Sequence, residues 1–237
     1  GVSQLPTGSK VLYFIGQFDG TSFHAEEGPC RLDSGYDHYA SSSWSNAPNG
    51  EVILTGWAAN LEYCGDIPAE TFRGTHTMPR KLSLVKTPRG WRIAQSPAAE
   101  ALDLRFSKPQ AFNRSAKLSS QTLKLQVAVG GKFKVSFTNG CGEALTIANF
   151  DDYLHCDRAS LIDFLARSPS HQTYGVSPAH LYHPNFSDLT VYLDGNICEV
   201  FADGGLIAMT NLFYPSRPFN EVHIAGVADA ELSEWED

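Results

Sequence analysis

"DLTVYLDGNICEVFADGGLIAMTNLF", residues 188–213, is the stretch that decides the fold of this chain. Leu189, Val191 and Leu193 alternate with more polar residues, so they fall on one face of an extended strand. Two Asp-Gly pairs separate this run from two further apolar runs, and such pairs suit hairpin turns because both residues tolerate a positive φ. The stretch therefore predicts consecutive strands that bury one side, as in a β-sandwich.

Short apolar or alternating runs of the same kind fill the rest of the chain. They are rich in Val, Ile, Phe, Tyr and Thr, which favour strands, and Gly, Asn, Asp and Pro separate them. The runs are KVLYFIGQF, EVILTGWAA, LKLQVAV, KFKVSFTN and ALTIANF, with turn pairs at 19–20, 49–50 and 139–140. PAAEALDL (97–104) fits one short helical turn, and ASLIDFLARS (159–168) is read as a strand because its neighbours are strands. The sequence predicts an all-β fold.

The composition is that of a globular protein, with 42% hydrophobic and 19% charged residues, and it excludes a disordered chain. The formal net charge of −8 argues against nucleic acid as a partner, because such binding draws on clustered Lys and Arg. No apolar run approaches the roughly 18 residues that a membrane helix needs, so no membrane partner is expected.

The five cysteines, at positions 30, 64, 141, 156 and 198, lack the spacing of a zinc site. They are read as free thiols, in the core or near the surface, and one disulfide stays open and unassigned. The sequence implies no metal and no organic cofactor. Asn113 and Asn185 begin Asn-x-Ser triplets, which are acceptor sites for N-glycosylation in a secreted protein.

A domain boundary is expected between residues 95 and 106. Trp44, Trp57 and Trp91 and most of the Gly-Asn-Asp turn chemistry precede it, whereas cleaner alternation follows it. We therefore expect one unit over residues 1–95, a linker over 96–105 and a β-sandwich over 106–237.

Five segments of the chain carry a resemblance to a known family. In order, they are YFIGQFDGTSF (13–23), LDSGYDHYASSSW (32–44), ILTGWAANLEY (53–63), FRGTHTMPRKLSL (72–84) and LTVYLDGNICEVFADGGLIAMTNLFYP (189–215). They resemble the later segments of the β-fructosidases of glycoside hydrolase family 32, which include invertases, levanases and inulinases. The resemblance implies a five-bladed β-propeller followed by a β-sandwich, with residues 1–95 as the last part of the propeller.

The resemblance also implies that the catalytic groups lie elsewhere. In the family the nucleophile belongs to an Asn-Asp-Pro motif, a second Asp belongs to Arg-Asp-Pro, and the general acid is a Glu followed by Cys. This chain contains no Asp-Pro and no Glu-Cys dipeptide, so no catalytic residue is assigned to it. We expect it to be the C-terminal half of such an enzyme, inactive alone, and to need an N-terminal propeller segment on the same or a companion chain.

Asp19 has two readings that both stay open. It suits a hairpin turn because Asp-Gly is a favoured pair there, and it also matches the family's Asp or Asn that contacts the sugar leaving group at the pocket rim. A catalytic role is not expected. Glu26, Glu27, Asp33 and Asp37 form an acidic cluster, for which a solvated loop is the simpler interpretation.

Three further residues are candidates for substrate binding through the resemblance. Asp37 and Tyr39 match the family's Gly-x-Asp-x-Tyr-Ala, although a structural role at the inner end of a strand stays open for both. Trp57 matches a Trp that lines the fructose pocket, where an aromatic face stacks on a sugar, and a core position stays open for it. Arg73 and Arg80 are expected to hold carbonyls or carboxylates between strands.

The complete protein is expected to hydrolyse terminal β-D-fructofuranosyl bonds of sucrose or small fructans, with retention through a fructosyl-enzyme intermediate. The resemblance implies an extracellular, vacuolar or periplasmic location. Leu61 replaces a second Trp of many members, which leaves the preference for long fructans open. Two alternatives also stay open: a carbohydrate-binding or structural β-sandwich module with a degenerate propeller remnant, and a fructosyltransferase.

Overall fold

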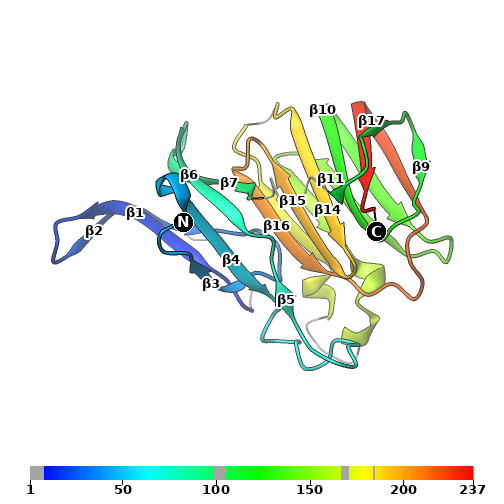
Figure 1. The fold of residues 1–237 in the computed structure, drawn as a ribbon, viewed down its shortest axis with the longest axis horizontal. Coiled ribbons are helices and arrows are strands. Elements are labelled where there is room, and N and C mark those ends of the chain that lie inside the picture. The colour runs from blue at the N-terminus through cyan, green and yellow to red at the C-terminus, as the bar shows by residue number, and fades with distance from the viewer. Residues whose placement is uncertain (1–7, 99–104, 167–170, 184, 237) are drawn as a thin grey trace.

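The computed structural model describes residues 8–98, 105–166, 171–183 and 185–236, and in these ranges strands are joined by loops and short 3-10 turns. Figure 1 shows a projecting hairpin at one end, a small sheet next to it and a large two-layered sheet at the other end. The predicted all-β fold is confirmed. No helix in the described ranges is long and apolar enough to cross a membrane. Most of the helical turn predicted at 97–104 lies outside the described residues.

Two antiparallel units come from the first part of the chain. The hairpin consists of β1 (Leu12–Phe18) and β2 (Phe23–Arg31). The small sheet, called the blade from here on, has the order β3-β4-β6-β7, with β5 paired to β4. Its strands are β3 (Tyr39–Ser43), β4 (Val52–Ala58), β5 (Thr75–His76), β6 (Arg80–Thr87) and β7 (Gly90–Pro97), and the 3-10 turn η1 spans Pro48–Gly50. An antiparallel sheet of four strands is the unit of a β-propeller.

The large sheet forms the sandwich, with the order β13-β12-β11-β10-β14-β15-β16 and with β17 pairing β10, β8 and β9. Its strands are β8 (Gln110–Ala111), β9 (Ser115–Lys117), β10 (Thr122–Thr138), β11 (Ala144–Phe150), β12 (Tyr153–Asp157), β13 (Val176–His180), β14 (Asp188–Asp194), β15 (Ile197–Ala202), β16 (Ile207–Leu212) and β17 (Glu221–Glu234). β10 pairs with β14 through its first half and with β11 through its second half, while β17 runs beside both halves. The long strands β10 and β17 therefore belong to both layers.

The two runs LKLQVAV and KFKVSFTN form the single bent strand β10. The pairing with β17 is irregular between Val129 and Lys134, at the bend. Gly226 of β17 lies opposite, with φ +69°, and a Cβ at this position would stand 2.0 Å from the carbonyl oxygen of Lys132. Gly226 therefore allows the two backbones to approach where the strands pass from one layer to the other.

The alternation that predicted the sandwich places Leu189, Val191 and Leu193 in its core. β15 and β16 differ from β14 because every residue in them is buried. One face of these strands meets the sandwich core and the other meets the blade, where Ala58 packs with Ile197 and Leu212. β15 and β16 therefore form the surface of the sandwich against which the blade packs.

The outer edge of β16 is covered by the segment before β3. The N–H of Ser34 donates to the carbonyl of Ala208 (2.8 Å), and the N–H of Asp37 donates to that of Thr210 (3.1 Å). A Cβ on Gly35 would lie 2.0 Å from the Thr210 oxygen. This contact satisfies an edge strand that would otherwise present unpaired backbone groups.

The strand predicted for ASLIDFLARS is wrong. Residues Ala159–Leu161 and Asp163–Leu165 form the 3-10 turns η3 and η4, and His171–Tyr174 forms η5. Leu161, Ile162 and Leu165 are all buried, and this spacing wraps around a turn instead of alternating between two faces.

Gly226→Ala should lower the free energy of unfolding by about 2–4 kcal/mol, because it adds a backbone clash to the strain of a positive φ. Gly140 has φ +71° but nothing within 4 Å of a built Cβ, so Gly140→Ala should cost only about 1 kcal/mol. Urea titrations of both variants measure the difference. Equal losses would contradict the proposed role of the bend.

Candidate functional site

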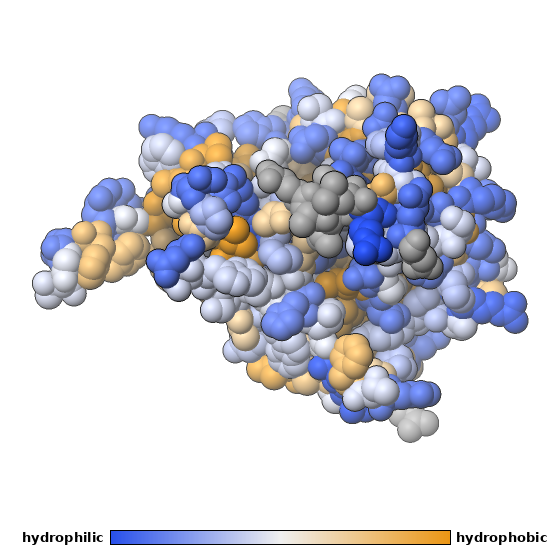
Figure 2. Space-filling model, viewed as in Figure 1, coloured by the Kyte–Doolittle hydropathy of each residue, from blue (hydrophilic) through white to orange (hydrophobic). Residues whose placement is uncertain are grey.

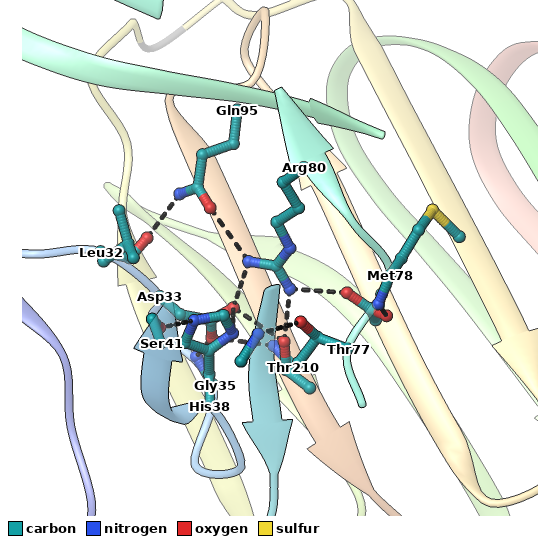
Figure 3. Close-up of polar contacts among 12 residues, drawn as sticks. Leu32, Asp33, Gly35, His38, Ser41, Thr77, Met78, Arg80, Gln95 and Thr210 are labelled. Carbon is teal, nitrogen blue, oxygen red and sulfur yellow. Dashed lines mark hydrogen bonds and ion pairs between the residues drawn. The ribbon is translucent and has the colours of Figure 1, made fainter. Parts of the chain in front are cut away.

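Arg80, at the start of β6, is fully buried and joins the blade to the sandwich. Its guanidinium donates to Asp33 (Nη1–Oδ2, 2.8 Å) and to Glu199 of β15 (Nη2–Oε2, 2.6 Å). It also reaches Gln95 of β7 (3.0 Å) and the hydroxyl of Thr210 in β16 (2.6 Å). Figure 3 shows Arg80 pointing between Gln95, Asp33 and Thr210. These residues are called the Arg80 cluster.

Both carboxylates of the Arg80 cluster are occupied by protein donors. Asp33 Oδ1 accepts the N–H of Gly35 (2.7 Å) and of Thr210 (2.9 Å), and Glu199 Oε1 accepts the N–H of Met78 (2.6 Å). Asp33 is 5% and Glu199 3% exposed. The expectation of a solvated loop is therefore wrong for Asp33, and both carboxylates are held by donors inside the protein.

The pKa values of the two carboxylates in the Arg80 cluster are shifted in opposite directions. Burial raises the pKa of Glu199, and the attraction of Arg80 only reduces this effect. Burial would also raise the pKa of Asp33, but the Arg80 charge and the hydrogen bonds from Arg80 and the Thr210 N–H together outweigh burial and hold that pKa below its usual value. Asp33 is therefore the firmly ionised partner of Arg80.

His38 lies against the same cluster and is 2% exposed. Its Nε2 bonds the Ser41 hydroxyl (2.7 Å), while its Nδ1 lies 3.7 Å from Asp33 Oδ2 and has no hydrogen-bond partner among the described residues. Burial lowers the pKa of His38 to about 4, against the attraction of Asp33. The imidazole is therefore neutral at neutral pH.

Arg158 follows β12 and reaches from the sandwich toward the blade. It is 1% exposed and donates to Asp37 Oδ2 (2.6 Å), to the Tyr63 hydroxyl (2.8 Å), and to the carbonyls of Tyr174 (3.0 Å) and Leu212. Burial would lower the pKa of Arg158, but the Asp37 carboxylate and the Tyr63 hydroxyl together outweigh burial and raise that pKa. These residues are called the Arg158 cluster.

Asp37, a candidate for substrate binding, lies inside the Arg158 cluster and is 0% exposed. Besides the bond from Arg158, its carboxylate accepts the N–H of Leu212 (2.7 Å) and the hydroxyl of Tyr63. The structure thus places Asp37 at the junction between blade and sandwich, with its oxygens occupied by protein groups.

Tyr39 and Trp57 lie together at one end of the blade. They are paired across β3 and β4, and Trp57 is also paired with His76 of β5. Both side chains are half-buried. A Cβ on Gly74 would stand 1.9 Å from Trp57 Nε1, so the indole packs directly on this glycine.

Asp19 lies at the tip of the hairpin, which projects away from the blade (Figure 1). Its Oδ1 accepts the N–H groups of Thr21 (2.8 Å) and Ser22 (2.7 Å), an Asx turn, and its Oδ2 lies 3.5 Å from His24 Nε2. The bonds from Ser22 and Thr21, followed by that from His24, lower the pKa of Asp19. The structure therefore does not bring Asp19 to Trp57 and Tyr39.

A cleft of about 550 Å³ opens between the loop that precedes β6 and the sandwich. The loop contributes residues 67–72 and 74–79, including Phe72, which is 72% exposed, and the sandwich contributes Tyr192, Asn196 and Tyr214. Burial raises the pKa of Tyr214 to about 12. Aromatic rings, amides and hydroxyls are groups that bind sugars. None of Asp19, Asp37, Tyr39 and Trp57 lines the cleft.

The sequence pattern identified part of the junction only. Arg80 holds carboxylates as predicted, whereas Arg73 is exposed. Arg158, Tyr63 and Gln95 were missed, because their partners are distant in sequence. The only feature of the neighbouring sequence that points to Arg158 is its position, since it is a cation that directly follows an apolar strand.

Two family models match the chain in succession. "Glycosyl hydrolases family 32 N-terminal domain" matches residues 2–97, and "Glycosyl hydrolases family 32 C terminal" matches residues 100–236. Among curated proteins, a levanase of Bacillus subtilis is 28% identical over 89% of this chain and 34% of its own length. An invertase of Schizosaccharomyces pombe is 30% identical over 87% of this chain and 41% of its own length. The chain thus spans less than half the length of either relative.

Solved structures show the same fold. The exo-inulinase of Aspergillus awamori superposes with a TM-score of 0.81 over 98% of this chain and 52% of its own, at 20% identity. A fructofuranosidase variant of Schwanniomyces occidentalis superposes with a TM-score of 0.77 over 97% of this chain and 54% of its own, at 19% identity. The last part of a five-bladed propeller followed by a sandwich, as expected, is confirmed. Matched over residues 2–97 and 100–236 by the two models, this chain belongs to glycosyl hydrolase family 32.

Proposed function

We propose that the chain is the C-terminal portion of a β-fructofuranosidase. The complete protein would hydrolyse terminal β-D-fructofuranosyl bonds of sucrose or small fructans with retention of configuration. The observation that carries the proposal is the match of both family models to a chain that covers 34% to 50% of its first three relatives, which are named levanase and invertase. Residues 1–95 would close the propeller, 96–105 link it, and 106–237 form the sandwich.

An exposed apolar surface supports a further propeller segment beside the hairpin. Phe14, Phe18 and Phe23 are 51%, 66% and 51% exposed, and Leu84 and Trp91 of the blade are 54% and 38% exposed. Figure 2 shows hydrophobic residues on the projecting hairpin and near its base. Large contiguous apolar surface is rare on a complete soluble protein, and propeller blades bury such faces against each other. A companion N-terminal segment would cover this surface.

The chemistry requires that segment as well. A retaining glycosidase uses two carboxyl groups about 5 Å apart, one of them with a raised pKa. Burial raises the pKa of Glu199 here, but its oxygens accept bonds from Arg80 and Met78 in the interior. The nucleophile and the general acid are therefore assigned to the N-terminal segment and not to this chain.

Within the assembled enzyme we assign different tasks to the candidate residues. Asp19 would bind leaving-group hydroxyls at the rim, because one of its oxygens remains outside the Asx turn. Trp57 and Tyr39 would form a wall of the fructose pocket, where a half-buried aromatic pair can stack on a sugar. The buried contacts of Asp37 favour a structural task at the junction over substrate binding.

An extracytoplasmic location is proposed because relatives include proteins named extracellular exo-inulinases. Asn113 and Asn185 are both exposed in the structure, so both triplets could accept a glycan there. The carbohydrate-binding alternative is favoured by one observation, the cleft before β6 with its aromatic and amide lining. A transferase would differ from a hydrolase in its products, which would include longer oligosaccharides.

The purified 237-residue chain should release no fructose from sucrose, because it lacks both working carboxylates. Activity should appear when an N-terminal segment with the Asn-Asp-Pro, Arg-Asp-Pro and Glu-Cys motifs is supplied. Chromatography of the products measures fructose and any longer oligosaccharide. Fructose release by the homogeneous chain would overturn the proposal, and fructan binding by calorimetry with no activity after complementation would favour the binding module.

Asp19→Asn in the assembled enzyme should raise the KM for sucrose about tenfold and keep most of kcat. Asn retains the acceptor that holds the turn but loses the charge that strengthens a hydrogen bond to a hydroxyl. Asp37→Asn is the matched control, which should lower the unfolding temperature and leave KM unchanged. A collapse of kcat in Asp19→Asn, or unchanged kinetics for sucrose and for longer fructans, would refute the rim assignment.

The neutral His38 should make stability depend on pH between about 6.5 and 4. The unfolded chain gains a proton at this residue below its ordinary pKa of 6.5, whereas the folded chain does so only at about 4. Stability is therefore full above this window and falls by at most about 3 kcal/mol as the pH falls through it. Urea titrations across the window should show a shallower slope for His38→Gln.

His76→Gln is the control for this measurement, because His76 is exposed and lies outside the Arg80 cluster. It should leave the pH dependence of unfolding unchanged. A His38→Gln slope equal to that of the unsubstituted protein would show that His38 is not held neutral.

A further inference from the structure

Two buried thiols face each other inside the sandwich. Cys156 of β12 and Cys198 of β15 are both 0% exposed and belong to the same apolar core. β12 lies in the layer that pairs through β11 to the second half of β10, and β15 lies in the layer that pairs through β14 to its first half. The two cysteines therefore come from opposite layers.

The pairing register aligns these positions. Cys156 is paired with Ser177 of β13, and Cys198 is paired with Asn211 of β16. Ser177 Oγ donates to Asn211 Oδ1 at 3.1 Å, so the side chains of Ser177 and Asn211 point toward each other across the gap between the layers. Paired residues of antiparallel strands share a face, which directs both thiols into the same gap.

We propose that Cys156 and Cys198 form a disulfide that ties the two layers together when the protein folds under oxidising conditions. The reaction joins the two Sγ atoms, and both thiols lose their hydrogen. The two electrons and two protons pass to a low-molecular-weight disulfide, such as oxidised glutathione, which becomes two thiols. The proposal rests on no glycosidase activity and requires only an oxidising compartment.

The other three cysteines do not compete for this bond. Cys141 is exposed, and Cys30 and Cys64 are half-buried outside the sandwich core. A disulfide needs Cβ atoms about 3.5–4.5 Å apart, and two positions on facing layers that point into the same gap are placed to meet this condition. A bond between the two sheets is also the arrangement that immunoglobulin sandwiches use.

Burial decides when the bond can form. The thiolate is the reactive species, and contact with Cys156 together with burial raises the pKa of Cys198. The folded, reduced protein should therefore resist oxidation, and the disulfide, once enclosed, should resist reduction until the sandwich opens. The bond should form during folding, before the layers close.

The test uses the protein secreted into an oxidising compartment and purified without reductant. It is denatured, alkylated with N-ethylmaleimide and digested, and the peptides are identified by mass spectrometry. We expect peptides with Cys156 and Cys198 to be joined and lighter by two hydrogens, whereas Cys30, Cys64 and Cys141 carry the alkyl group. Alkylation of both Cys156 and Cys198, or their joining to other cysteines, would overturn the proposal.

A second readout separates the bond from simple packing. Unfolding and refolding with reductant should lower the Tm by about 5–10 °C, the shift expected when a disulfide that closes a loop of this length is lost. Cys156→Ala and Cys198→Ala should each abolish this redox dependence, and Cys64→Ala, the control, should keep it. Redox dependence that survives in both core variants would also overturn the proposal.

Discussion

Two buried arginines that point in opposite directions hold this structure together. Arg80 extends from the blade to Glu199 and Thr210 of the sandwich, and Arg158 extends from the sandwich to Asp37 on the blade side. Each charge has left water, so it is tolerable only while its partner stays in place. Separating the blade from the sandwich would leave both arginines and their carboxylates without partners. Breaking one such buried pair typically costs about 3–5 kcal/mol of stability. The junction is therefore rigid, and both parts of the chain depend on it.

The arrangement of the sheets follows from this junction. β15 and β16 are buried on both faces because they carry the sandwich core on one side and the blade on the other. The blade is therefore presented to its neighbours in one orientation. The hairpin, in contrast, projects with Phe14, Phe18 and Phe23 exposed. The chain thus combines an enclosed junction with a hairpin whose apolar side chains have no cover within the described residues.

Sequence reasoning succeeded where the governing interaction is local. Alternation and Asp-Gly turns predicted β14, β15 and β16, because side-chain period and turn geometry act within a few residues. It failed where a distant contact decides. The two runs that look like separate strands form one strand, β10, because Gly226 of β17 allows a bend between them. The segment 161–165 forms 3-10 turns and not a strand, because Leu161 packs in the sandwich core while Ile162 and Leu165 pack in a second apolar cluster. Arg158 could not be assigned at all, since its carboxylate partner is far away in the sequence.

Asp19 and Asp37 show that a match to a family motif does not by itself define the role of a single residue. Both lie in segments that resemble the family, and both carboxylates accept backbone N–H groups. Asp19 uses one oxygen to close its own turn and keeps the other at the surface, whereas Asp37 has its oxygens enclosed by Arg158, Tyr63 and Leu212. A hydroxyl of a substrate can bind only an acceptor that it can reach, so exposure and not residue type separates the two. A motif match therefore identifies where the family places an aspartate, and only the surrounding contacts decide whether that aspartate serves the substrate or the fold.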